Sequence, residues 1–428
     1  MEQAVTPHEA THPKENEPRP KLIRPWRSRW REQQHATDHS ASASAPPVLD
    51  HELVPRGEPE WVDSPAALAR LTDTLRQAGA FAFDTEFIGE DAYHPRVCLV
   101  QIATPTLLAI VDPLASLDLR PLWELVVDES VEKTVHAGSQ DLAFAWRSTG
   151  RGPANIFDTQ ICSAFAGQPH SQGLGKMVTA LLGADVGGSA KFTRWDARPL
   201  TPLQQQYAAN DVRYLPAIRA LLRGKLLETG NAAFAHGACV DAFGESLFIP
   251  EPPEMRLKIQ ALHRWSSPQL GALHALARWR EDLAVREDLP PRVLFPDAVM
   301  ADLVRHVLGD GPENDTLDAV KGFPRPIRQA HGGEIVQVIR AGAGHKPPRM
   351  KRPKRISEKQ AVAARDMSEA MWARAAEICA ARQIDLQTVT SKRELHRLAC
   401  LHAAGIEPEE PIRVLSGWRA QLLGSLAD

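Results

Sequence analysis

The chain has 428 residues, 43% of them apolar, and a formal net charge of −3, which suits a soluble protein with two or three ordinary hydrophobic cores. The five cysteines show no paired spacing such as CxxC, so the sequence indicates neither a zinc site nor a disulfide framework. The longest apolar runs, VCLVQIA and LLAIV, are too short to span a bilayer, and we therefore expect a cytoplasmic protein without a membrane partner.

Changes in composition along the chain predict five segments. Residues 1–57 are rich in Pro, Glu, Arg, Ser and His and predict a disordered arm. Short β-rich runs followed by helical patterns predict an α/β domain with a mixed central sheet over residues 58–230. Helical patterns without strand-like alternation predict two small all-α domains, at 256–342 and 358–428, joined by a basic linker at 343–357.

In chain order, the α/β domain begins with a helix that Asp63 or Ser64, followed by Pro65, introduces and Gly79 ends. The runs FAFDTEF, RVCLVQIAT and LLAIVDP then predict three strands, and a helix around PLWELVVD and a strand at KTVHA follow. In the first all-α domain a helix opens at Ser267 and Pro268. Its apolar stripe is formed by Leu270, Leu273, Leu276, Trp279 and Leu283.

The second all-α domain opens with a helix over about 358–383. The run SKRELHRLACLHA follows as a second helix, in which Ser391 and Glu394 have the spacing of a capping box, and a last helix is expected around PIRVLSGWRAQLLG. Two basic runs, RPKLIRPWRSRWR near the start and HKPPRMKRPKR at 345–355, could bind a polyanion, although a solvated segment is the ordinary alternative.

Four acids and one tyrosine stand in distinctive local frames: Asp84 and Glu86 in FAFDTEF, Asp141 in HAGSQDL, and Tyr207 with Asp211 in YAAND. Residues at i and i+2 of a strand point to one face, and residues at i and i+4 of a helix lie on one stripe, so these spacings allow the carboxylates to gather. Crowded carboxylates repel one another or take up protons, and hard oxygen ligands suit Mg²⁺ or Mn²⁺. The pattern therefore indicates a divalent-metal site for a phosphodiester substrate.

Each of these residues also has an ordinary interpretation when it is taken singly. Asp84 and Glu86 could mark a solvent-facing edge strand, and Asp141 could be a first-turn acid that the helix dipole stabilises. Tyr207 could be a half-buried aromatic residue, and Asp211 a surface acid of an amphipathic helix. The metal site thus depends on all five residues coming together.

Together these motifs resemble the three exonuclease motifs of the tyrosine-bearing subgroup of the DEDD superfamily. The surrounding sequence is similar to that of the ribonuclease D family. The matching runs, in the family's order, are FAFDTEF, VCLVQIA, HAGSQDL, IFDTQIC, GLGKMV, RWDARPLTPLQQQYAANDVRYL and SGWR. The resemblance covers residues 61–228 most fully and implies a ribonuclease H-like mixed-sheet exonuclease domain. The two all-α segments resemble the HRDC-type domains that follow the nuclease in bacterial members.

The resemblance implies a metal-dependent 3′→5′ exoribonuclease that releases 5′-mononucleotides, in tRNA 3′ maturation or in processing and turnover of other stable RNA. It implies that Asp84, Glu86, Asp141 and Asp211 hold two divalent ions, Mg²⁺ or Mn²⁺, and that Tyr207 positions the attacking water. The expected partner is RNA with a free 3′ end, tRNA precursors above all, and the expected state is a monomer. Residue chemistry agrees, because two cations can activate a water on one side of a phosphorus and neutralise the departing 3′ oxygen on the other.

Three further residues are candidates for contact with the RNA. Phe87, beside the DTE acids, could stack on a terminal base, His136 could contact a phosphate or the leaving group, and Arg198 could contact the backbone. Core packing, a structural histidine and a solvated arginine are the respective alternatives. The helical domains, the linker and the arm are expected to hold the body of a folded RNA through its phosphates.

Two competing functions use the same residues. A 3′→5′ DNA exonuclease of the proofreading or Werner type needs the same carboxylates, but the sequence has no GxxxxGK[ST] phosphate loop for an attached helicase and no polymerase-sized region after the nuclease. A catalytically lapsed RNA-binding protein has no need to keep mutually repulsive acids. The exoribonuclease is therefore the leading hypothesis.

Overall fold

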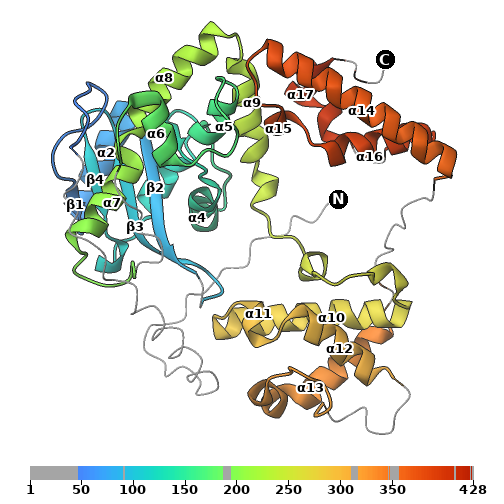
Figure 1. The fold of residues 1–428 in the computed structure, drawn as a ribbon. Coiled ribbons are helices and arrows are strands. Elements are labelled where there is room, and N and C mark those ends of the chain that lie inside the picture. Colours follow the sequence, from blue (N-terminus) through green and yellow to red (C-terminus); the bar gives the residue numbers. More distant parts are fainter. Residues whose placement is uncertain are drawn as a thin grey trace, which may run out of the picture. The chain divides into compact units, whose positions relative to one another are not determined.

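The computed structural model describes residues 47–89, 92–186, 194–309, 317–345, 347, 356–408, 411–424 and 426 (Figure 1). Most of the predicted arm and linker, and nearly all of both basic runs, therefore lie outside the described residues. The chain forms two compact units. The sheet unit comprises Ala43–Phe87, Val97–Ile249 and Lys354–Asp428, and the helical unit is formed by Pro250–Pro353 with the loop Ile88–Arg96.

The sheet unit is built on six strands in the order β1-β4-β3-β2-β5-β6. From β1 to β6 the strands are Glu60–Val62, Ala80–Ile88, Arg96–Ala103, Leu108–Val111, Glu132–Val135 and Ile156–Asp158. β1 pairs parallel to β4, β3 pairs antiparallel to β4, and β5 pairs parallel to both β2 and β6. The sheet is therefore mixed, as the sequence predicts.

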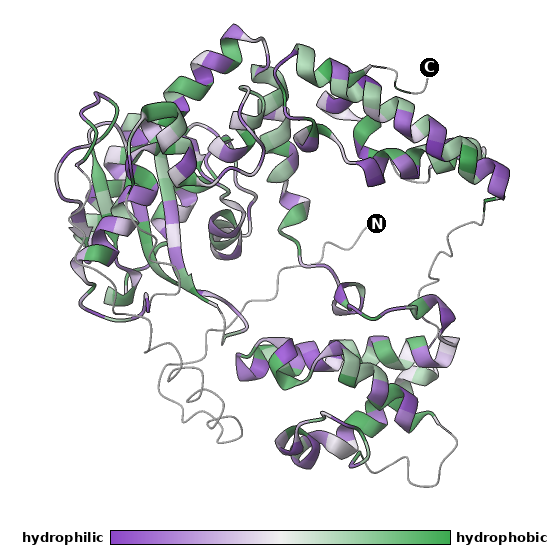
Figure 2. Cartoon of the chain, viewed as in Figure 1, coloured by the Kyte–Doolittle hydropathy of each residue, from purple (hydrophilic) through white to green (hydrophobic). Residues whose placement is uncertain are grey.

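Helices follow and separate these strands in the order that the hydrophobic patterns predict. They are α2 (Pro65–Ala78), α3 (Arg120–Val126), α4 (Ser139–Thr149), α5 (Thr159–Ala164), α6 (Leu174–Leu182), α7 (Pro202–Arg213), α8 (Leu215–Glu228) and α9 (Ala232–Ala242). Short 3-10 turns lie at Pro113–Ala115 and Glu245–Leu247. Most of these helices carry both hydrophilic and hydrophobic residues, as expected for helices with one face on a core (Figure 2).

The two faces of the sheet pack against different helices. On one face, Ala209 of α7 lies in a small apolar cluster with Ala82 of β2 and Ala103 of β3. On the other face, Phe83 of β2 lies edge-on to Trp123 of α3, with 6.4 Å between the ring centroids. Because side chains alternate along a strand, the even-numbered residues of β2 face α7 and the odd-numbered residues face the main core.

The C-terminal segment forms four helices that join the same unit: α14 (Glu358–Ala381), α15 (Leu386–Val389), α16 (Lys392–Ala403) and α17 (Gly417–Leu423), with a 3-10 turn at Arg413–Leu415. Their buried residues belong to one hydrophobic cluster with those of the sheet domain. The C-terminal helices therefore share a core with the sheet domain, and their assignment as a second HRDC-type domain stays a prediction.

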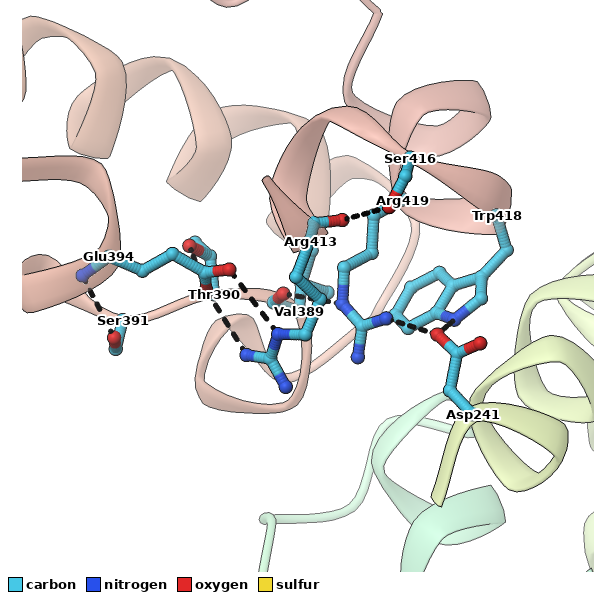
Figure 3. A network of polar contacts seen from close by, with 9 residues as sticks. All are labelled: Asp241, Val389, Thr390, Ser391, Glu394, Arg413, Ser416, Trp418 and Arg419. Atoms are coloured by element: carbon cyan, nitrogen blue, oxygen red, sulfur yellow. Dashed lines mark hydrogen bonds and ion pairs between the residues drawn. The ribbon is translucent and has the colours of Figure 1, made fainter. Parts of the chain in front are cut away.

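A polar network on α9 fixes this junction (Figure 3). The indole nitrogen of Trp418 donates to Asp241 at 2.8 Å, and the guanidinium of Arg419 binds the same carboxylate. Arg419 Nε also donates to the carbonyl of Val389 at 3.1 Å. Gly237 lets the indole approach α9, since a Cβ there would lie 2.8 Å from the Trp418 ring.

The predicted capping box of α16 forms only in part (Figure 3). Ser391 accepts a hydrogen bond from the amide of Glu394 at 3.2 Å, as predicted. The Glu394 carboxylate does not return to the N-cap amide but accepts from Thr390 at 3.2 Å and pairs with Arg413 at 3.1 Å. A tertiary partner thus competes with the local bond.

The helical unit contains α10 (Ser267–Glu287), α11 (Pro291–Leu294), α12 (Asp297–Val307) and α13 (Arg325–Ala343), preceded by 3-10 turns at Pro253–Arg256 and Leu262–Arg264. The predicted apolar stripe of α10 is buried. Gly271 of α10 and Gly342 of α13 allow a close approach of the two helices, because a Cβ on Gly271 would lie 2.4 Å from the Gly342 carbonyl oxygen. Among the described helices, none is long and apolar enough to cross a bilayer.

Candidate active site

Strand β2 presents Asp84 and Glu86 on the sheet face that α7 covers. Both follow Ala82 at steps of two residues, and Ala82 packs against Ala209 of α7 on that face. Both carboxylates are only partly exposed, whereas the intervening Thr85 is buried on the opposite face. The strand pattern therefore delivers two acids to one place, as predicted.

Asp141 enters from the first turn of α4, which follows β5 through a tight turn at Gly138. A Cβ on Gly138 would lie 2.6 Å from the Val135 Cβ, so the turn needs glycine. Asp141 is buried, and its carboxylate accepts a hydrogen bond from the hydroxyl of Thr85. Thr85, which the sequence analysis does not single out, therefore orients one of the four acids.

Helix α7 carries the remaining two residues. Thr201 and Gln204 form a complete capping box, with hydrogen bonds of 3.2 and 2.8 Å, and fix where the helix begins. Tyr207 and Asp211 then lie one turn apart, close enough for each side chain to shift the pKa of the other. The i, i+4 spacing thus works as predicted.

The carboxylates of these three elements affect one another's ionisation. Burial, followed by the charge of Asp141, raises the pKa of Asp84 well above its ordinary value. Burial and then the charges of Asp211 and Asp141 raise the pKa of Glu86 to about 8. Burial raises the pKa of Asp211 to about 7 although the neighbouring Tyr207 side chain opposes this rise. The structure therefore brings all four acids together.

The donor set fits a divalent metal. Carboxylate oxygens are the ligands that Mg²⁺ and Mn²⁺ prefer, and a cation would relieve the mutual repulsion. Within the described part of the chain, however, no three Asp, Glu, His or Cys side chains stand close enough to hold an ion as they are. Asp141 is turned toward the Thr85 hydroxyl, from which it accepts a hydrogen bond.

Tyr207 is neutral over the physiological pH range. Burial, followed by the charges of Asp211, Glu86 and Asp84, raises the pKa of its phenol far above the ordinary value. The Tyr207 ring also packs on Trp195, with 6.1 Å between the centroids and 33° between the planes. A neutral phenol beside the acids can orient a water but cannot serve as a base.

Phe87 and His136, predicted to contact RNA, both have partners in the core. Phe87 lies edge-on to Phe144 of α4, 5.3 Å between centroids, and packs against the main hydrophobic cluster. His136 Nδ1 lies 2.9 Å from Thr159 Oγ1, and the Thr159 hydroxyl itself donates to the carbonyl of Val135. Burial lowers the pKa of His136. Among the described residues the buried Nε2 of His136 has no hydrogen-bond partner. Contact of Phe87 or His136 with RNA stays a prediction.

Arg198 lies in the loop before α7, as predicted, but is not a solvated surface arginine. Its guanidinium forms an ion pair with Asp112, in which Nε lies 2.6 Å from the carboxylate. It also donates to backbone carbonyls, among them that of Trp195 at 2.9 Å. The structure thus gives Arg198 partners within the protein, and its contact with RNA stays a prediction.

Asp158 is a structural acid that the sequence analysis leaves aside, although it stands in the quoted run IFDTQIC. Its buried carboxylate accepts from the amides of Gln160 and Ile161 at the start of α5, at 2.8 and 3.2 Å. It also accepts from the amide of Gly138 at 3.1 Å. Asp followed by a helical run is the signal of an N-cap, and here the cap also fixes the turn that positions Asp141.

Gln101 of β3 is a second residue that the sequence analysis leaves aside. It lies two residues before Ala103, on the face that α7 covers, and is fully buried. Among the described residues neither atom of its amide group has a hydrogen-bond partner. Buried amides normally have hydrogen-bond partners. The unpaired amide of Gln101 lies on the same sheet face as the carboxylates.

Comparisons with known proteins agree with this geometry. Residues 59–227 match the family model described as 3′-5′ exonuclease, and residues 269–339 match the model of the HRDC domain. The first range contains all five site residues, and the second lies within the helical unit. The predicted order of an exonuclease domain and a helical HRDC domain is therefore confirmed.

Ribonuclease D of Gluconacetobacter diazotrophicus is 30% identical over 377 residues, which cover 86% of this chain and 92% of that protein. The chain belongs to the ribonuclease D family. Ribonuclease D of Escherichia coli K12 is 28% identical and covers 85% of this chain and 96% of its own length. The predicted class of enzyme, a 3′-5′ exoribonuclease, is thereby confirmed.

The fold of the ribonuclease D family extends over most of the chain. The crystal structure of Escherichia coli RNase D, described as an exoribonuclease involved in structured RNA processing, superposes with a TM-score of 0.74. It is 28% identical, and the match covers 86% of this chain and 96% of that one. The catalytic core of RRP6 from Trypanosoma brucei, at 22% identity and a TM-score of 0.51, shares the fold.

Proposed function

We propose that this enzyme depends on divalent metal and trims the 3′ ends of structured RNA, tRNA precursors included, releasing 5′-mononucleotides. The observation that carries the proposal is the meeting of four carboxylates from β2, α4 and α7. Burial, and then the charges of neighbouring acids in this group, raises the pKa values of Asp84, Glu86 and Asp211. Within the described residues no ion pair joins an arginine or lysine to any of them. A group of buried acids without a cation is a functional arrangement rather than a stabilising one.

Asp84, Glu86, Asp141 and Asp211 would hold the ions, which when bound lower the pKa of a water and stabilise negative charge on the phosphate. The protein's own part is to bring these oxygens together from a strand and two helices. Partial burial of the acids keeps competing water away and strengthens their attraction for a cation.

Tyr207 supplies orientation. It lies one helical turn from Asp211, and because burial keeps the phenol neutral, its oxygen can accept a hydrogen bond from the attacking water. Holding that water in line with the scissile bond lowers the entropic cost of reaching the transition state. The terminal nucleotide then leaves with its 5′ phosphate.

Structured RNA as the substrate is inferred from the described activity of the Escherichia coli relative, together with basic residues of the C-terminal helices. Helix α16 exposes Lys392, Arg393 and Arg397, and the Lys392 ammonium lies over the ring of Trp372 at 5.4 Å. Exposed cations of this kind bind phosphates without reading sequence. The body of a folded RNA is thereby held while its 3′ end enters the site.

The nuclease proposal is tested on a single-stranded RNA with a free or a blocked 3′ end, in Mg²⁺, in Mn²⁺ and in chelator. Mononucleotides should appear only from free ends and only with metal. Internal cleavage, or release in chelator, would contradict the mechanism. A matched 3′-labelled DNA separates the exoribonuclease from a DNA exonuclease, since the proposal predicts faster hydrolysis of the RNA.

The role of α16 is tested by the double variant Arg393→Gln/Arg397→Gln, which leaves the shared core intact. Loss of two phosphate contacts should weaken binding of a folded RNA. It should lower the slope of log Kd against log salt by roughly 1.4 to 1.8, at about 0.7 per contact on a single strand and about 0.9 on a duplex. The rate on a short single strand should not change. An unchanged salt slope would contradict this part of the proposal.

A further inference from the structure

Arg198 is held by the protein itself at every nitrogen of its guanidinium. Nε and Nη2 each donate to one carboxylate oxygen of Asp112 at 2.6 Å. Nη2 also donates to the Cys98 carbonyl at 2.9 Å, and Nη1 donates to the carbonyls of Trp195 and Ala197 at 2.9 and 2.8 Å. A guanidinium has five N–H donors, and these contacts use all five, so none is left for a phosphate.

The contacts of Arg198 join the sheet to the loop that leads into α7. On the sheet side, Cys98 lies in β3, and Asp112 directly follows β4, where its own amide donates to the carbonyl of Val62 at 2.9 Å. On the loop side are two carbonyls a few residues before Thr201, the N-cap of α7. A bidentate pair of this kind fixes orientation as well as distance.

The loop carries Trp195, whose side chain is buried and packs on the ring of Tyr207. Trp195 is 5% exposed, and its carbonyl is one of those that Arg198 binds. The tyrosine ring therefore packs on the indole of Trp195, and Arg198, paired with Asp112, holds the backbone of Trp195 in place. Burial, and then the charge of Asp211 one helical turn further along α7, raises the pKa of the same tyrosine.

We infer that Asp112, Arg198 and Trp195 form a clamp that positions Tyr207 for the exonuclease reaction. The inference rests on the role proposed for Tyr207 and assigns positioning, not contact with RNA, to all three clamp residues. A side chain that orients water acts over a narrow range of geometry, and a displacement of about 1 Å can reduce a rate on the order of 10²-fold. Loss of the clamp should therefore lower kcat and leave KM unchanged.

The clamp is tested by a double-mutant cycle between Trp195 and Tyr207. Trp195→Phe and Trp195→Ala should lower kcat in the wild-type background, on the order of 10-fold for the alanine variant. In a Tyr207→Phe background the same changes should lower kcat less than about 2-fold, because the group they position is gone. Equal losses in both backgrounds would overturn the inference.

The cycle also separates this inference from the proposed function. If Tyr207→Phe alone leaves kcat unchanged, the role proposed for the tyrosine fails. If Tyr207→Phe lowers kcat, but the Trp195 substitutions lower kcat by the same factor with and without the tyrosine hydroxyl, only the inferred clamp is contradicted. The phenylalanine variant keeps an aromatic ring in the loop, so the cycle can be read even if the alanine variant does not fold.

Arg198 distinguishes a clamp from a phosphate contact. In Arg198→Lys the positive charge remains but the bidentate geometry is lost, so the clamp predicts a fall in kcat, whereas a phosphate contact would largely survive. The salt slope of RNA binding should be unchanged in Arg198→Gln; a decrease of about 0.7 would assign Arg198 to the RNA backbone instead.

Arg151→Gln is the matched control, because Arg151 also binds one carboxylate and one carbonyl, beyond the C-terminal end of α4. It should leave kcat unchanged.

Discussion

Buried carboxylates stand in two opposite electrostatic settings in this protein. In the helical unit, Glu254 is buried against Arg278, whose hydrogen bond lowers the pKa of the acid. In the sheet unit, Asp84, Glu86 and Asp211 have raised pKa values because burial and neighbouring acids disfavour their charges. The first arrangement stabilises the fold, and the second weakens it unless a ligand supplies positive charge. Several acids that lie together without a cation therefore identify the functional site, whereas the single buried Asp158 is satisfied by backbone amides.

The largest expected effect comes from changing one of the acids that have no cationic partner. Asp84→Asn removes one charge from the cluster and one ligand from the proposed metal site, so kcat should fall by on the order of 10³-fold. The melting temperature in chelator should not fall, because a repulsive charge has been removed. Activity assays and thermal unfolding of the same sample check both. Activity within about 10-fold of the wild type would contradict the assignment of Asp84.

Tyr207→Phe removes a hydroxyl but no charge, and it separates orientation from metal binding. We expect kcat to fall by on the order of 10²-fold with little change in KM, because the phenol positions the water and does not bind RNA. Affinity for Mn²⁺ should be nearly unchanged, since the four carboxylates remain. A loss of metal binding equal to that of Asp84→Asn would show that the two roles are not separate.

Stability should depend on pH in opposite ways with and without metal. Glu86 and Asp211 have folded-state pKa values of about 8 and about 7, above the ordinary 4.5 and 3.8. Such groups add stability that is complete below the unfolded-state pKa and is lost as pH rises through the folded-state pKa. In chelator, the melting temperature should therefore fall between about pH 4.5 and pH 8.

Metal and substitution give the controls for this pH dependence. Mn²⁺ at pH 8 should restore the melting temperature by binding the ionised acids. Glu86→Gln should flatten the decline in chelator, because its amide does not titrate. A melting temperature that rises over the same pH range in chelator would contradict the raised pKa values.

The smallest expected effect comes from changing Glu254, the acid that is paired with Arg278. Glu254→Gln leaves Arg278 without its acid, and because the arginine is 64% exposed, the cost should be only about 1 kcal/mol of unfolding free energy. Exonuclease activity on a short single strand should not change. The lower pKa of Glu254 means that its contribution is present above the unfolded-state pKa of about 4.5 and is lost in acid. Denaturant unfolding at pH 7 and pH 3 checks both statements.

Local patterns predict the parts of the site that depend on spacing along one element. The DTE alternation and the i, i+4 spacing of Tyr207 and Asp211 are sufficient, because strand and helix periodicity determine which side chains share a face. The strands Glu60–Val62 and Ile156–Asp158 were missed because three residues are too few to show alternation.

Contacts between distant segments were beyond the reach of such patterns. Nothing in the local sequence of Thr85 shows that its hydroxyl reaches Asp141, which lies 56 residues later. Arg198 has the appearance of a surface arginine in a polar loop, and only the fold brings Asp112, 86 residues earlier, to its guanidinium. Local patterns likewise do not show that Trp418 and Arg419 of the quoted run SGWR bind Asp241 of α9.

The central claim, that the unpaired carboxylates form a divalent-metal site, is tested most directly by calorimetric titration with Mn²⁺ at pH 7 in two buffers of different ionisation enthalpy. The account predicts two ions per chain and net release of protons, because Glu86 and Asp211 are partly protonated before metal binds. Binding should be strongly weakened in Asp84→Asn. No saturable binding, or binding without proton release that the substitution leaves unchanged, would contradict the account.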